Sequence, residues 1–161
     1  MKPAIIYTSY TGTTHKVAEQ IHEACGGDLI EVKSWDIMSR VFMYMARHSP
    51  EIQVRDDGVP PSAIDLSGYD LVVIGTPVWM GKPAPCIRKT IAGLTGCNGK
   101  PVVIFATCGE KPGTTLEILA KDLAAQGMTA AGQYSMNTEE IREGTVLKTL
   151  IAKVKDSGSG P

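Results

Sequence analysis

The sequence predicts an α/β protein in which a doubly wound, three-layer sheet of five parallel strands lies between two layers of helices. Short apolar runs, which are typical of strands buried on both faces, alternate along the chain with segments whose apolar residues recur at helical spacing. The length of 161 residues suits a single domain. We expect that domain at residues 1–155, followed by a flexible C-terminal tail at 156–161.

The first part of the chain supplies two of these strands. We expect a strand at 4–8 and a helix at 13–25. The pair of glycines at 26–27 is a signal for the end of this helix. Alternation of polar and apolar residues predicts a short strand at 28–33, at or near an edge of the sheet. The apolar residues of 40–48 indicate a short helix, and the glycine and prolines of 56–62 indicate a loop.

Residues 69–76 form the strongest strand pattern, because their apolar residues are consecutive, as expected for a central strand. The same reasoning predicts the later elements. They are a helix that includes 84–94, a strand at 100–106, a helix at 115–126, a strand at 128–136 and a helix at 139–155.

Composition excludes several classes of protein. The net charge of −1 gives no electrostatic reason to expect nucleic acid or a membrane surface as a partner. No apolar stretch is long enough to cross a bilayer. The chain begins almost directly with a strand and so leaves no room for a signal peptide, from which we expect a cytoplasmic protein.

The metal-ligating and nucleophilic residue types are scattered. No two cysteines have Cys-x-x-Cys spacing, so we expect reduced thiols that fill the core or loops, and no metal site. The histidines are interpreted as solvated surface residues. The residues concerned are Cys25, Cys86, Cys97 and Cys108, and His15, His22 and His48.

A loop rich in hydroxyl groups follows the first strand and opens the first helix. It contains Ser9, Tyr10, Thr11, Gly12, Thr13 and Thr14. The first amides of a helix have no partner within the helix, and the helix dipole favours an anion there. Since the loop has no Lys or Arg, it suits a phosphate monoester held by neutral donors. The alternative is an ordinary helix cap made of Ser and Thr.

The arrangement Ser9-x-Thr11-Gly12-x-Thr14 after Ile5-Ile6-Tyr7 resembles the phosphate loop of the flavodoxin family. The resemblance implies that this loop binds the phosphate of FMN. It also implies the strand order 2-1-3-4-5, in which the loops after strands one, three and four meet at the switch point of the sheet.

The second of these loops is similar to one that flanks the flavin ring in small flavodoxin-like proteins. Its candidate cofactor-binding residues are Pro77, Val78, Trp79, Met80 and Gly81. The resemblance implies that Trp79 packs against the flavin and that Gly81 lets the backbone change conformation with the redox state. Alternatively, the Trp-Met pair is a hydrophobic plug over the sheet or a dimer contact.

The third loop resembles the Gly-Cys-Gly-Asp turn that contacts the pyrimidine edge of the ring in some flavodoxins. Its candidates are Thr107, Cys108, Gly109 and Glu110, of which the first and last depart from that pattern. No aromatic residue occurs between Thr107 and Gly113 to cover the second face of the ring. The segment with Trp35, Phe42 and Tyr44 could supply a lid, or else face the core.

The resemblance implies an FMN-binding protein, and our hypothesis is that it carries electrons between a redox protein donor and a redox protein acceptor. We expect a monomer or a weak homodimer. We expect no catalytic side chains, because the flavin carries the redox chemistry. The nearly neutral charge leaves open an FMN-dependent NAD(P)H:quinone-type oxidoreductase. A third alternative is a flavodoxin-like binding domain without flavin.

Overall fold

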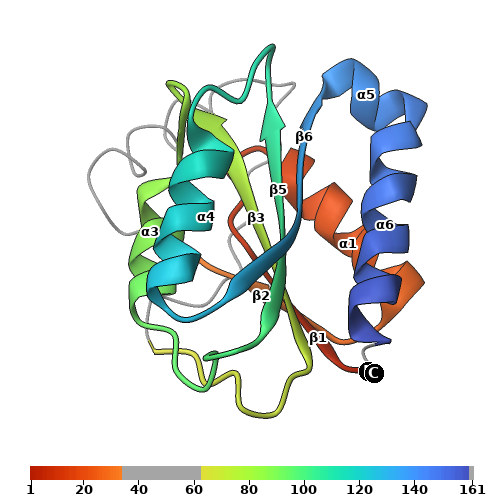
Figure 1. Ribbon diagram of the computed structural model, residues 1–161. Coiled ribbons are helices and arrows are strands. Elements are labelled where there is room, and N and C mark those ends of the chain that lie inside the picture. Colours follow the sequence, from red (N-terminus) through yellow and green to blue (C-terminus); the bar gives the residue numbers. More distant parts are fainter. Residues whose placement is uncertain (34–62, 160–161) are drawn as a thin grey trace.

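A computed structural model describes residues 1–33 and 63–159 of the chain (Figure 1). Its central sheet has the order β2-β1-β3-β5-β6, and neighbouring strands on this path are parallel. This confirms the predicted doubly wound sheet and, counting only these parallel strands, the order 2-1-3-4-5. The strands are β1 (Pro3–Tyr7), β2 (Asp28–Glu31), β3 (Leu71–Trp79), β5 (Pro101–Cys108) and β6 (Thr129–Asn137).

Helices cover both faces of the sheet, as predicted, and Figure 1 shows the three layers. Helices α1 (Thr13–Cys25) and α6 (Thr145–Gly158) contact each other on one face, and α3 (Pro85–Ala92) and α4 (Thr115–Ala125) on the other. Each face has its own apolar core, because alternate residues of β1, β3 and β5 point to opposite sides. The strands are therefore buried on both faces, which is why their sequences are almost continuously apolar.

The segment after residue 76, expected to be a loop, is instead the start of a hairpin. Strand β3 continues to Trp79 and pairs antiparallel with β4 (Lys82–Pro83). The turn consists of Met80 and Gly81, whose φ angles are 53° and 76°. Positive φ at both central residues defines a type I′ turn, whose twist matches that of the paired strands.

The last predicted helix is two helices. Helix α5 (Thr138–Glu143) ends at Gly144, whose φ of 79° interrupts the helical backbone before α6 begins. Helix α6 also runs three residues into the segment expected to be a flexible tail. Gly158 lies against the side chain of Met1, which occupies the space that a Cβ would need and packs the end of α6 onto the N-terminus.

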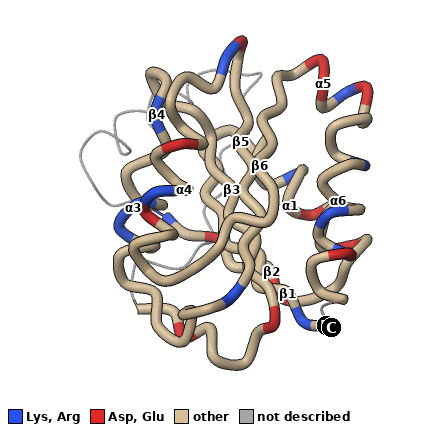
Figure 2. The backbone as a smooth tube through the Cα atoms, in the orientation of Figure 1, with Lys and Arg blue, Asp and Glu red and all other residues tan. Residues whose placement is uncertain are grey.

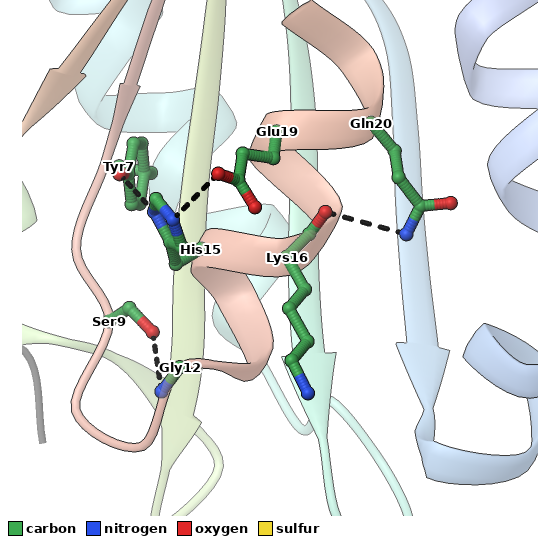
Figure 3. Close-up of polar contacts among 7 residues, drawn as sticks. All are labelled: Tyr7, Ser9, Gly12, His15, Lys16, Glu19 and Gln20. Atoms are coloured by element: carbon green, nitrogen blue, oxygen red, sulfur yellow. Dashed lines mark hydrogen bonds and ion pairs between the residues drawn. The ribbon is translucent and has the colours of Figure 1, made fainter. Parts of the chain in front are cut away.

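Helix α1 is fixed to the sheet by a histidine that the sequence placed at the surface. His15 is only 6% exposed, and its Nδ1 shares a hydrogen bond with the buried hydroxyl of Tyr7 on β1. Its Nε2 lies 3.3 Å from Glu19 Oε1, one turn further along the helix (Figure 3). The expectation of a solvated His15 was wrong. The Tyr7 hydroxyl is buried beneath α1 and needs a hydrogen-bond partner, and the His15 ring supplies it.

Some expectations lie outside the described residues. These are the short helix at 40–48, the loop at 56–62, and the lid that Trp35, Phe42 and Tyr44 could supply. Within 1–33 and 63–159, no helix is long and apolar enough to cross a membrane.

Candidate functional site

The carboxyl ends of the central strands meet at the upper edge of the sheet in Figure 1, and a cavity opens there. Its volume of about 270 Å³ is close to the lower end of the range for small-molecule sites, about 300–1,000 Å³. Residues from all three predicted loops line it. They are Tyr10, Thr11, Thr13 and Thr14 of the first loop, Pro77, Val78 and Trp79 of the second, Thr107, Cys108 and Gly109 of the third, and Thr138.

An aromatic contact joins the first loop to the second. The rings of Tyr10 and Trp79 lie 5.2 Å apart between centroids, with their planes inclined by 32°. Tyr10 is buried, whereas Trp79 is half-buried and lines the cavity. The cavity thus has an aromatic wall, a surface suited to a planar apolar group.

A hydroxyl pair joins the first loop to the third. The Oγ1 atoms of Thr14 and Thr107 are 2.8 Å apart, and both residues are buried. The start of α1 is thereby tied to the end of β5, although the two residues are far apart in sequence.

The first loop leaves the start of α1 open to an anion. Gly12 precedes the helix with φ of 95°, and neither a side-chain cap nor an acidic residue occupies the first turn in the part of the chain described. The hydroxyls of Thr11 and Thr13 lie 3.4 Å apart beside it. Unpartnered amides, neutral hydroxyls and the positive end of the helix dipole together favour a phosphate group.

Ser9 has a different place from the one expected. Its Oγ accepts a hydrogen bond of 3.0 Å from the amide of Gly12, as Figure 3 shows, and it does not line the cavity. This contact closes the loop on itself and holds Gly12 in its left-handed conformation. In this structure Ser9 and Gly12 shape the loop, whereas the threonines face the cavity.

The hairpin tip is held from outside the cavity. The carbonyl oxygen of Gly81 accepts hydrogen bonds from the amide of Thr114 at 2.9 Å and from its hydroxyl at 3.3 Å. Gly113 packs directly on Gly81. Met80 is 96% exposed, and neither it nor Gly81 lines the cavity. These contacts fix the backbone that carries Trp79.

The third loop contributes Thr107, Cys108 and Gly109 to the cavity, whereas Glu110 is exposed and does not line it. Burial raises the pKa of the Cys108 thiol, and the negative charge of Glu140 raises it further. The thiol is therefore protonated at neutral pH and contributes a polarisable surface rather than a nucleophile.

Thr138 is the cavity residue that the sequence reasoning missed. It is the first residue of α5, which begins where β6 ends. A signal was present, since Asn137 and Glu140 form a capping box with hydrogen bonds of 2.8 and 3.3 Å. This spacing predicts a helix start directly after a strand, at the same edge of the sheet as the three loops.

None of the four cysteines is part of a disulfide, and no group of His, Cys, Asp and Glu within the described ranges could hold a metal ion. The donors at the start of α1 and the aromatic wall are the two kinds of surface that a flavin mononucleotide needs. The residues present therefore fit this group.

The fold and the site define a doubly wound α/β protein with a ligand-type cavity at the switch point between β1 and β3. The profile of a flavodoxin family matches residues 2–134. The chain belongs to the flavodoxin family.

Solved structures agree with this assignment. A protein from Bacteroides eggerthii, described as a candidate flavoprotein, is 26% identical with a TM-score of 0.62, and the match covers 96% of each chain. A Lactobacillus acidophilus flavoprotein in complex with FMN is 22% identical over 88% of this chain and 97% of its own, with a TM-score of 0.56. Two-electron reduced Megasphaera elsdenii flavodoxin is 16% identical over 98% and 99% of the two chains, with a TM-score of 0.64. No curated protein gives a significant match.

Proposed function

We propose that this protein binds FMN at the switch point of the sheet and uses it to carry electrons between a redox protein donor and a redox protein acceptor. The observation that carries the proposal is the meeting, in one cavity, of the open start of α1 with the aromatic pair of Tyr10 and Trp79. The likeness to flavoproteins supports it.

Each part of the cavity has a role in this proposal. Thr11, Thr13 and Thr14, with the first amides of α1, would hold the phosphate as hydrogen-bond donors. Trp79 would face the ring and exclude water from it. The bound FMN supplies the redox chemistry, so the chain's own residues need only bind, orient and shield it.

Electron carriage requires a partner to reach the edge of the cavity. In Figure 2 the basic and acidic residues are interspersed along the described chain rather than gathered in one block. The net charge is only −1. A net charge this small gives the protein no strong overall field of one sign to steer a partner, so short-range contact would select the partners. We propose a monomer or a weak homodimer as the working form.

The nearly neutral charge leaves room for a second candidate, an FMN-dependent NAD(P)H:quinone-type oxidoreductase. The two functions differ in one assay. FMN-loaded protein mixed with NADH or NADPH and a quinone should leave the nicotinamide absorbance unchanged if the protein is a carrier. Steady nicotinamide oxidation that depends on the quinone would favour the oxidoreductase.

FMN binding itself is tested by calorimetric titration of the flavin-free protein with FMN and with riboflavin. Riboflavin lacks the phosphate, so it should bind at least about tenfold more weakly, since one or two charge-assisted hydrogen bonds contribute about 1.5–3 kcal/mol each. Equal affinities would place the phosphate outside the first loop. If neither flavin binds, the third alternative, a flavodoxin-like binding domain without flavin, would be favoured.

A further inference from the structure

The hydroxyl pair of Thr14 and Thr107 has a feature that phosphate binding does not by itself require. Thr14 is 1% exposed and Thr107 5% exposed, yet both line the cavity, and their Oγ1 atoms are 2.8 Å apart. Thr107 lies on β5 next to Pro77 of β3 and Met136 of β6, so its position is fixed by the sheet on both sides. Thr14 lies in the first turn of α1.

A threonine hydroxyl has one hydrogen to donate and can accept through two lone pairs. In the hydrogen bond between the pair, either hydroxyl can be the donor. A phosphate in the cavity fixes the direction of this hydrogen bond. Its oxygens only accept hydrogen bonds, so Thr14 can bind the phosphate only by donating its single hydrogen to it. If Thr14 donates its hydrogen to the anion, the pair can stay bonded only when Thr107 donates to Thr14 Oγ1.

We propose that Thr107 is a positioning residue for the phosphate: its hydroxyl donates to Thr14 Oγ1 and thereby directs the Thr14 hydrogen toward the anion. The inference rests on the proposed FMN function and extends it to a residue at the end of β5. The two hydroxyls and the phosphate form a chain of hydrogen bonds that all run in one direction. In such a chain each bond polarises the next and strengthens it.

The test compares Thr107→Val, which removes the donor at nearly constant volume, with Thr107→Ser, which keeps it. Thr115→Val is the matched control, because Thr115 is buried on α4 and its hydroxyl has no hydrogen-bond partner among the described residues. Each variant is titrated by calorimetry with FMN and with riboflavin.

Loss of one neutral hydrogen bond in this chain corresponds to a weakening of about three- to tenfold. We therefore expect the Val variant at Thr107 to bind FMN about three- to tenfold more weakly and riboflavin within twofold of wild type. The Ser variant should recover most of the FMN affinity. The control at Thr115 should match wild type for both ligands. A merely structural role of Thr107 would weaken both flavins alike.

A double-mutant cycle supplies a second readout. In a Thr14→Val background, Thr107→Val should have almost no further effect on FMN affinity, because the hydroxyl that it directs is gone. An undiminished effect would overturn the inference.

The outcomes separate the inference from the proposed function. Wild-type protein that binds neither FMN nor inorganic phosphate would overturn both. Wild-type protein that binds FMN with a preference over riboflavin, together with a Val variant at Thr107 that binds FMN equally well or loses riboflavin equally, would overturn the inference alone.

Discussion

The contact between Gly113 and Gly81 makes a sharp prediction about how the hairpin is held. Gly113 has φ of 58°, in the left-handed region, and a Cβ placed on it would lie 2.6 Å from both the Cα and the carbonyl oxygen of Gly81. Both of these atoms belong to the backbone, so the crowding cannot be relieved by a rotating side chain. We expect Gly113→Ala to be among the more damaging glycine substitutions in this chain.

The cost has two parts that a second variant can separate. An Ala at this φ costs about 1–2 kcal/mol, and forcing a methyl group into a filled space costs about 1–3 kcal/mol. Gly99 has φ of 78°, but nothing lies within 4 Å of its Cβ position. Gly99→Ala should therefore lose only the first part, and Gly113→Ala about 2–5 kcal/mol in total.

Urea unfolding followed by circular dichroism measures both variants. The predicted result is a free energy of unfolding for Gly113→Ala that is about 1–3 kcal/mol below that of Gly99→Ala, with similar slopes against urea concentration. In a marginally stable domain this difference is readily measured. Equal stabilities would refute the reasoning, because they would show that the backbone at Gly81 can move away from a methyl group on residue 113 at no cost in free energy.

Two further predictions concern the core and the cavity. A Cβ on Gly75 of β3 would lie 2.2 Å from the ring of Phe105. Gly75→Ala should therefore lower the free energy of unfolding by about 1–3 kcal/mol in the same urea assay. A Cβ on Gly68 would meet nothing within 4 Å, so the control Gly68→Ala should leave the free energy of unfolding almost unchanged. The second prediction concerns Glu140, whose charge raises the pKa of Cys108. Glu140→Gln removes this charge but keeps a side chain that can serve in the capping box. The pKa of Cys108 should therefore fall, and its thiol should react faster with iodoacetamide at pH 8. The rate is measured by mass spectrometry of the peptide that contains this cysteine, and an unchanged rate would show that the charge does not act on the thiol.

Much of the architecture could be predicted because the signals were local and repeated. Strands buried on both faces need continuous apolar runs, and helices that cover a sheet need one apolar face, so the bounds of α1 followed directly from its pattern. The hydroxyl loop could be identified because its composition is unusual between a strand and a helix. The structure brings most of the predicted residues of the three loops to one cavity.

The remaining features depend on contacts between distant parts of the chain. The turn at Met80 could not be predicted, because a non-glycine residue with a φ of 53° is uncommon. Its conformation depends on the pairing of Val78 with Pro83 on either side of the turn. The burial of His15 depends on the hydroxyl of Tyr7 beneath it. The pairing of hydroxyls across the cavity likewise could not be derived from either loop alone.

The central claim is that one cavity holds FMN, with its phosphate at the start of α1. The most direct test is a crystal structure of the protein grown with FMN. The account predicts a phosphate within hydrogen-bond distance of the hydroxyls of Thr11 and Thr13, and a flavin ring against Trp79. A phosphate remote from residues 11–14, or a ring bound away from the hairpin, would contradict it.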